Sequence, residues 1–306
     1  MTAQTGTTAR RQQKGERALP LGAPPSGSRG TSAGGAPRWL TLTALWVGVV
    51  VMVTPFLWMV LSSFKSERDL GATPTVWIPD DWTLIHFRKL LELLDMGGHF
   101  FNSTLVATVV TACNLIFCSM LGYALAKLNF VGKRPVFGLV LGALMVPHNL
   151  MMMPMFVMMS KMGLVDSYAG LILPFAAGAF GVFLMRQFMT GIPDELLEAA
   201  RIDGANEWFI FWRIAMPLVK PALATLAIFT FLGSWNNFLW PLVATNDPDK
   251  YTLPVALATF AIDPDKTDGS NGILMAGAFL IVLPVLIVFV VLQRFFTQGI
   301  ATAGLK

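Results

Sequence analysis

The chain has 306 residues, of which 55% are hydrophobic and only 13% are charged, and its formal net charge is +4. A soluble enzyme of this length would need more charge on its surface, so the composition excludes an ordinary soluble domain. The apolar residues lie in long blocks rather than in alternation, which predicts an all-α membrane protein.

The first 38 residues differ from the rest of the chain. They are rich in Gly, Ser, Thr and Pro and carry mostly basic charges, a composition that cannot bury a core. We therefore expect residues 1–38 to form a disordered basic tail. This tail is too long and too polar for a secretory signal, so the apolar run from Trp39 is predicted to remain as the first span.

Six apolar runs are long enough to cross a membrane, since about 18 residues suffice. They make 39–306 a six-span domain and cover residues 39–63, 102–126, 136–160, 169–189, 218–242 and 271–294. With both termini in the cytoplasm, the inner segments hold most of the Lys and Arg residues and the outer segments most of the acids. The segment 190–217 then lies on the cytoplasmic side. This bias also accounts for the net positive charge, so no nucleic-acid partner is expected.

The outer segments 67–95 and 247–268 are acidic. A short helix is predicted around residues 82–95, and Asn102 with Ser103 is typical of an N-cap at the start of span two. These segments either face solvent or meet a partner, and both interpretations stay open.

Polar side chains at membrane depth usually line a cavity or bind a neighbouring helix. They gather at three places: Asn114 in span two, His148 and Asn149 in span three, and Trp235, Asn236 and Asn237 in span five. A Trp beside amides suits a sugar, because the ring stacks on its apolar face and amides both donate and accept hydrogen bonds. Hydrogen bonding between helices is the alternative for span five, and it is the preferred interpretation for Asn114.

Span three carries two prolines, Pro147 and Pro154, which predict breaks that line protein or a water-filled path. The methionines Met151, Met155 and Met159 recur every four residues. Such a stripe suits either a soft metal or adaptable packing. We favour packing and predict no metal site.

The sequence has no nucleophile triad, no H-E-x-x-H, no Cys/His cluster and no paired buried carboxylates, which argues against an intramembrane enzyme. An ion-coupled secondary transporter of a small polar solute is an alternative, but such proteins place ionisable residues inside their spans. The C-terminal Gly299, Gly304 and Lys306 resemble a phosphate loop without its Ser/Thr and its following helix. We therefore predict that the chain binds no cofactor and does not itself hydrolyse ATP.

The cytoplasmic segment 190–217 is predicted to form two short helices. Pro193 suits the first helical position, Asp194 favours the first turn, and Gly204 permits a sharp break. The second helix is expected from about Ala205, and Pro217 ends it or kinks it into span five. This second helix is rich in aromatic residues: Trp208, Phe209, Phe211 and Trp212. Exposed aromatic side chains predict a docking element, with an amphipathic helix at the membrane surface as the alternative.

The stretch EAARIDGANEWFIFWRIAMPLVKP resembles the cytoplasmic EAA loop of binding-protein-dependent ABC importers. The pattern is filled by Glu198, Ala199, Ala200, Asp203, Gly204, Ala205, Phe209, Ile214, Pro217 and Pro221. From about Trp39 onward, the segments SSFKS, NSTLVA, GYALAKLNFVGKR, GSWNNFLWPL and QRFFTQGIATAGLK resemble carbohydrate-importer permeases of the maltose-permease type.

This resemblance implies the type I ABC importer permease fold in a bacterial cytoplasmic (inner) membrane, with a sugar as substrate. It makes residues 190–217, hereafter the coupling loop, a lever that sits in a cleft on an ATPase subunit. It also implies a tail that reaches between the ATPases, carrying Gln298, Gly299 and Gly304. The partners that it implies are a second permease, usually a distinct chain, two ATPase copies that bind ATP and Mg, and an extracytoplasmic solute-binding protein.

Overall fold

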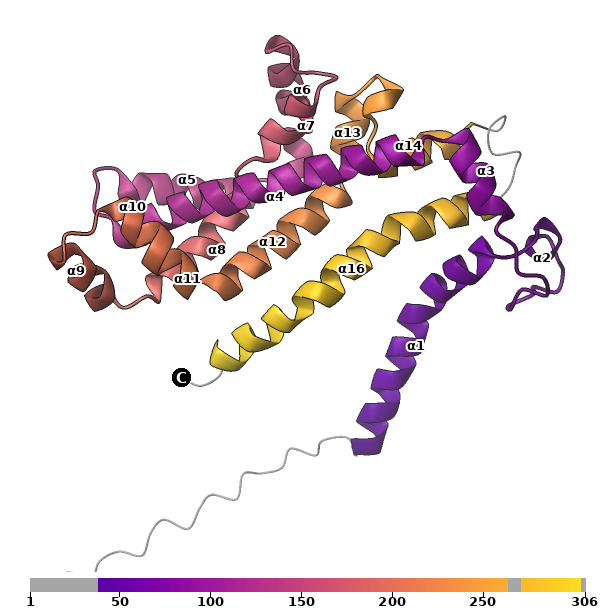
Figure 1. The fold of residues 1–306 in the computed structure, drawn as a ribbon, viewed down its shortest axis with the longest axis horizontal. Coiled ribbons are helices and arrows are strands. Elements are labelled where there is room, and N and C mark those ends of the chain that lie inside the picture. The colour runs from indigo at the N-terminus through magenta and orange to yellow at the C-terminus, as the bar shows by residue number, and fades with distance from the viewer. Residues whose placement is uncertain (1–37, 264–270, 304–306) are drawn as a thin grey trace, which may run out of the picture. The chain divides into compact units, whose positions relative to one another are not determined.

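The computed structural model describes residues 38–263 and 271–303, with side chains for 39–263 and 271–291. The described secondary structure is helical throughout (Figure 1). The chain divides into two units, Met1–Met52 and Val53–Lys306. The predicted tail lies outside the described residues up to residue 37, and helix α1 (Arg38–Ser63) starts in the first unit and ends in the second.

Three of the predicted spans are single helices. Trp39–Ser63, Met96–Lys127 and Asn271–Val291 are each long and apolar enough to cross a membrane, and they belong to α1, α4 (Met96–Lys127) and α16 (Asn271–Ala303). Before α4, the outer segment holds α2 (Glu67–Leu70) and α3 (Ile85–Leu93), which confirms the predicted short helix around 82–95.

The other three spans are broken. Helix α5 (Lys133–Met145) is bent by 99° from His148–Lys161, which comprises η1 (His148–Met151) and α6 (Met152–Lys161). Tyr168–Phe175, formed by α7 (Tyr168–Ile172) and η2 (Leu173–Phe175), is bent by 42° from α8 (Ala179–Thr190). Helix α12 (Lys220–Trp235) ends early, and α13 (Leu239–Ala244) continues after a gap. A third bent pair is formed by Glu207–Leu218 and α12, and with each bent pair counted as one span, the described residues hold up to six candidate spans.

One of the two prolines of span three accounts for its break. Val146, just before Pro147, is extended at φ −86° and ψ 119°, because a residue before proline is driven out of the helical region. Pro154 was predicted to break the span as well, and this was wrong. It lies in the first turn of α6, where backbone N–H groups have no partner within the helix.

The coupling loop contains α9 (Asp194–Ile202), α10 (Glu207–Phe209), the π-helix η3 (Ile210–Ala215) and α11 (Met216–Leu218). Helices Glu207–Leu218 and α12 meet at 81°. The break lies at Val219, between Pro217 and Pro221, and Pro221 in the first turn of α12 has no N–H to continue the preceding helix. On the outer side, the chain adds η4 (Pro248–Lys250) and α14 (Leu253–Ala261).

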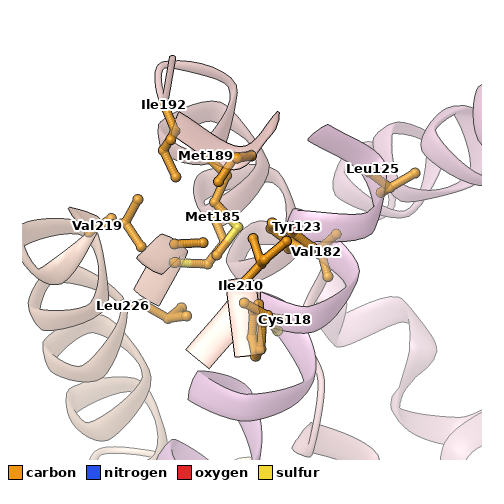
Figure 2. Close-up of a cluster of buried hydrophobic side chains, with 14 of the residues drawn as sticks. Cys118, Tyr123, Leu125, Val182, Met185, Met189, Ile192, Ile210, Val219 and Leu226 are labelled. Atoms are coloured by element: carbon orange, nitrogen blue, oxygen red, sulfur yellow. The ribbon is translucent and has the colours of Figure 1, made fainter. Parts of the chain in front are cut away.

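Helix α4 is the centre of the second unit, packing along both α8 and α12, while α12 also packs along α16. Figure 2 shows the apolar cluster where side chains of α4, α8, η3 and α12 meet. A Cβ added at Gly122 would lie 2.8 Å from the Met185 Cβ and 2.9 Å from the Arg186 backbone nitrogen. Glycine at this position therefore lets α4 and α8 pack with their backbones close together.

Asn102 and Ser103 do not cap α4, so that prediction was wrong. The helix begins at Met96, where the Asp95 side chain accepts a hydrogen bond from the Gly98 N–H. Asn102 is buried one to two turns further on, and its Nδ2 donates to the backbone carbonyl oxygens of Asp249 and Tyr251. The Ser103 hydroxyl accepts from the Leu253 N–H at 2.7 Å. Asn102 and Ser103 therefore fasten the outer loop to α4.

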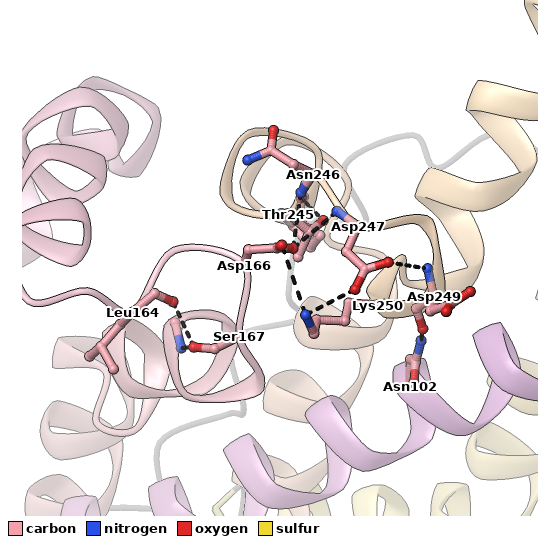
Figure 3. A network of polar contacts seen from close by, with 11 residues as sticks. Asn102, Leu164, Asp166, Ser167, Thr245, Asn246, Asp247, Asp249 and Lys250 are labelled. Carbon is pink, nitrogen blue, oxygen red and sulfur yellow. Dashed lines mark hydrogen bonds and ion pairs between the residues drawn. The ribbon is translucent and has the colours of Figure 1, made fainter.

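The outer end of the fold is tied together by a polar network around Asp166 (Figure 3). Asp166 has a positive φ of 63°, and its Oδ1 accepts the backbone N–H groups of Asn246 and Asp247. The Lys250 ammonium lies 3.0 Å from Asp247 Oδ2 and 3.8 Å from Asp166 Oδ2. The hydrogen bond from Lys250 lowers the pKa of Asp247.

Candidate functional site

A cavity of 680 Å³ lies where all three broken spans meet. Its lining comes from α4, from η1, from the junction of η2 and α8, and from the junction of α12 and α13. Breaks in membrane helices are tolerated where the freed backbone groups face protein or a water-filled space. The convergence of the breaks therefore marks this cavity as the candidate path through the membrane.

Five of the six residues predicted for the substrate path line this cavity: Asn114, His148, Asn149, Asn236 and Asn237. Within the described lining, the polar side chains are amides, hydroxyls and one imidazole, and there is no Asp, Glu, Lys or Arg. The imidazole of His148 contacts the Phe175 ring at a centroid distance of 5.2 Å. Such a lining offers both donors and acceptors for neutral hydroxyl groups.

Trp235 is the exception and corrects the prediction of a sugar-stacking ring in span five. Its side chain is only 1% exposed and does not belong to the cavity lining. The ring stacks on Phe231, and its Nε1 donates to the Ile281 carbonyl oxygen of α16 at 3.1 Å. A buried indole N–H requires such a partner, so Trp235 joins α12 to α16.

Asn114 holds the break between η2 and α8. Its Nδ2 donates to the carbonyl oxygens of Phe175, at 2.6 Å, and Val110, and its Oδ1 accepts from the Gly178 N–H at 3.0 Å. The amide thus uses both its donors and its acceptor within the protein, as expected for the helix-joining interpretation. Its contribution to the cavity is to fix the shape of this wall.

Asn236 and Asn237 end α12. The Nδ2 of Asn236 donates to the Leu232 carbonyl oxygen at 2.9 Å, and Oδ1 of Asn237 accepts from the Trp240 N–H at 3.4 Å, near the start of α13. The remaining amide groups are available to the cavity that both residues line.

Sequence reasoning missed two hydroxyl residues of the lining, Thr230 and Ser234. With Gly233, they lie on one face of α12, and Asn237, two residues past the end of that helix, continues the spacing i, i+3, i+4 and i+7. That spacing was the signal available in the sequence.

Two of the three methionines of the span-three stripe pack against apolar neighbours, whereas Met151 is 47% exposed. Met159 is buried in a cluster with Leu171 and Trp240, and Met155 packs against that cluster. No group of three metal-ligating His, Cys, Asp or Glu side chains occurs in the part of the chain that the structure describes.

The coupling loop presents one face of α9 to solvent and buries the other. Leu197 and Ala200 are buried, whereas Glu198 and Ala199 are exposed. Pro193 is the N-cap residue rather than the first helical residue, and Asp194 begins the helix. Of the EAA residues, Ala200 therefore packs inside the protein, while Glu198 and Ala199 face solvent.

Gly204 makes the turn between α9 and α10 with a positive φ of 84°, a conformation that L-residues rarely adopt. The second helix begins at Glu207 instead of Ala205, because Asn206 acts as the N-cap and accepts from the Phe209 N–H at 2.8 Å. Asp203 is exposed beside the turn, and Ala205 is half-buried.

Five large apolar side chains of the coupling loop are exposed, and together they are called the exposed patch. Ile202 is 85% exposed and Trp208 is 60% exposed, and the patch also includes Leu196, Phe209 and Trp212. Phe211, predicted as part of the aromatic face, is instead buried with Ile210 in the cluster against α4. Ile214 packs against the same cluster, and Pro217 is exposed.

Polar side chains hold the coupling loop at the start of α9 and at the start of α10. Lys127 of α4 donates to the carboxylate of Asp194 at 2.6 Å, and this hydrogen bond lowers the pKa of Asp194. At the start of α10, Arg201 Nε donates to Oε1 of Glu207 at 2.7 Å, while the Tyr123 hydroxyl donates to its Oε2 at 2.8 Å. The starts of α9 and α10 are thereby attached to α4.

Part of the predicted ATPase-contacting tail lies outside the described residues. Gln298 and Gly299 fall within the backbone of α16, and Gly304 follows the last described residue.

Comparison with known proteins places these features in a family. Residues 118–302 match the family described as "Binding-protein-dependent transport system inner membrane component". The arabinooligosaccharides transport system permease protein AraQ of Halalkalibacterium halodurans is 39% identical, over 88% of this chain and 96% of that protein. The diacetylchitobiose uptake system permease protein NgcG of Streptomyces coelicolor is 34% identical, over 83% of both chains. The lactose transport system permease protein LacG of Rhizobium radiobacter is 31% identical, over 86% and 94%.

The fold agrees with a solved transporter. A crystal structure of a bacterial ABC transporter involved in the import of the acidic polysaccharide alginate superposes with a TM-score of 0.76 and 26% identity, covering 86% of this chain and 99% of that one. The chain belongs to the inner-membrane components of binding-protein-dependent transport systems, as a multi-pass, non-catalytic permease subunit of an ABC importer.

Proposed function

We propose that this permease passes a neutral sugar through the 680 Å³ cavity, driven by an ATPase that docks on the coupling loop. The relatives named for arabino-oligosaccharides, diacetylchitobiose and lactose support a saccharide substrate. The observation that carries the choice of a neutral sugar is the lining of amides and hydroxyls without a charged side chain among its described residues. A carboxylate placed there would lose its hydration without gaining a cation.

The coupling loop is proposed as the ATPase contact. Its exposed patch contains large apolar side chains, and such patches on a soluble face commonly mark a protein partner. Glu198 lies on the exposed side of α9 and supplies a negative charge for a basic or polar group of the ATPase. The cavity-lining residues proposed to meet the sugar are His148, Asn149, Asn236 and Asn237.

The assembly is proposed to hold a second, distinct permease chain, two ATPase copies that bind ATP and Mg, and an extracytoplasmic solute-binding protein. A second permease accounts for lining residues that remain exposed here, such as Gly233 and Asn236. The predicted tail with Gln298, Gly299 and Gly304 is proposed to contact the ATPases.

Two proline substitutions, each at a glycine with positive φ, test the role of the coupling loop. Gly204 and Gly163 both have positive φ, at 84° and 68°, and neither has atoms near an added Cβ. Proline requires φ near −65°, so Gly204→Pro and Gly163→Pro each distort one turn. We expect Gly204→Pro and Glu198→Lys each to insert normally but to lose ATPase co-purification and uptake. Gly163→Pro should keep co-purification. Full uptake by both coupling-loop variants would contradict the proposal.

A further inference from the structure

Helix α4 contacts the coupling loop at two places, the start of α9 and the start of α10. Tyr123 and Lys127 lie four residues apart, so they project from the same face of α4. The Tyr123 hydroxyl donates to Glu207 after the turn at Gly204. The Lys127 ammonium, whose side chain is only 5% exposed, bonds the start of α9 through Asp194 and the Ile192 carbonyl oxygen, each at 2.6 Å.

Contacts within the coupling loop also join α9 to α10. Arg201 at the end of α9 binds Glu207 at the start of α10 through Nε and Nη2, at 2.7 and 3.4 Å. Beneath this pair, Leu197 is buried with Ile210 in one apolar cluster. Because both halves share polar and apolar contacts, a force on the exposed patch moves the loop as one body.

The same helix reaches the cavity. One residue before Tyr123 in α4, Gly122 brings the backbones of α4 and α8 together. Further along α4, Asn114 binds Phe175 and Gly178 at the break that forms a wall of the cavity. Packed helices shift as rigid elements, so a displacement of the end of α4 is carried to this wall.

We infer that Tyr123 and Lys127 are positioning residues that clamp the coupling loop to α4, so that loop movement is converted into movement of the cavity wall. The inference rests on the proposed function, since it assumes that the loop receives its force from the ATPase. The clamp contributes to transport through α4 and makes no contact with sugar or nucleotide. Its loss should therefore separate ATP hydrolysis from transport.

The test uses the complete transporter in membrane vesicles and measures the number of sugar molecules imported per ATP hydrolysed. Tyr123→Phe removes the hydroxyl and keeps the ring that contacts Phe211 at 5.4 Å. Lys127→Met keeps a chain of similar length without the ammonium. We expect each variant to retain bound ATPase and ATP hydrolysis while the import ratio falls at least threefold, with a larger fall in the double variant.

Two control variants define the result. Tyr168→Phe removes a half-buried hydroxyl that donates to Asn102 at the outer end of α4, at 2.7 Å, and should keep the ratio. Lys127→Arg keeps the cation and should restore most of the ratio. An unchanged ratio in Tyr123→Phe and Lys127→Met overturns the clamp, and these single variants remain decisive if the double variant does not insert.

The same experiment separates this inference from the proposed function. If Gly204→Pro still retains its ATPase and imports sugar, the docking role of the coupling loop fails. If Gly204→Pro loses the ATPase but the clamp variants import sugar at the normal ratio, only the clamp fails.

Discussion

Asn114 of α4 binds Phe175 across the break in the fourth span, with its Nδ2 2.6 Å from the Phe175 carbonyl oxygen. Its Oδ1 accepts from the Gly178 N–H on the other side of the break. One buried amide thus supplies the hydrogen bonds that the interrupted helix lacks. The broken fourth span is stabilised by a residue of the second.

Asn114→Leu should destabilise the protein, because it leaves the Phe175 carbonyl and the Gly178 N–H without their partner. A buried unpaired group costs about 1–3 kcal/mol. We expect a lower midpoint of thermal unfolding in detergent, together with slower uptake. Asn246→Leu is the control, since that side chain is exposed and should leave the midpoint unchanged. A wild-type midpoint for Asn114→Leu would show that the break holds without the amide.

Gly122→Ala should weaken the packing of α4 on α8. The added methyl group meets the Met185 Cβ at 2.8 Å and the Arg186 backbone nitrogen at 2.9 Å, so the helices must separate. Overpacking of this kind costs about 1–3 kcal/mol. Gly138→Ala is the matched helical control, because nothing lies within 4 Å of its added Cβ. Thermal unfolding should distinguish the two, and equal midpoints would contradict the close approach.

Asn237 has two separable roles, an acceptor near the start of α13 and a polar group in the cavity. Asn237→Asp keeps the acceptor for the Trp240 N–H, whereas Asn237→Ala loses it. If the amide meets sugar, both variants should lower the maximal uptake rate about fivefold, since one hydrogen bond contributes on the order of 1 kcal/mol.

The external half-saturation concentration for uptake by these variants should not change, because the solute-binding protein captures the sugar first. ATPase co-purification should also remain normal. Wild-type uptake by Asn237→Asp would assign Asn237 to the support of α13 alone.

Asn102→Leu should release the outer loop from α4. The carbonyl oxygens of Asp249 and Tyr251 then lose their donor, and Tyr168 loses its acceptor. Amide hydrogen exchange in residues 247–253 should become about tenfold faster, corresponding to about 1.4 kcal/mol of local opening. Exchange in α9 serves as the internal reference. Unchanged rates in 247–253 would place the stability of this loop in the Asp166 network instead.

The apolar blocks predicted the spans because hydrophobicity over about 18 residues depends little on tertiary contacts. The breaks were harder to predict. Pro147 predicts the break in span three, but the break before α8 depends on Asn114, which is distant in sequence. Trp235 and Asn236 are adjacent, yet one is buried against α16 and the other lines the cavity. Only packing between helices decides which neighbour faces inward.

The coupling loop was more predictable because its signals are local. Gly204 supplies the positive φ, and Asn206 caps the helix that follows. The exception is Phe211, which the π-helix turns toward α4 instead of solvent. Tyr123 and Glu207 lie 84 positions apart, and no local pattern predicts their hydrogen bond.

The central claim is that the exposed side of the coupling loop docks on an ATPase subunit. Site-specific photo-cross-linking tests it most directly, with a photoreactive residue at Glu198 or Trp208 in the complete transporter. The control position is Val131, which is fully exposed on the turn between α4 and α5. We predict adducts with the ATPase from both loop positions, stronger than any adduct from Val131. Absence of an ATPase adduct from both loop positions, in a transporter that still imports sugar, would contradict the account.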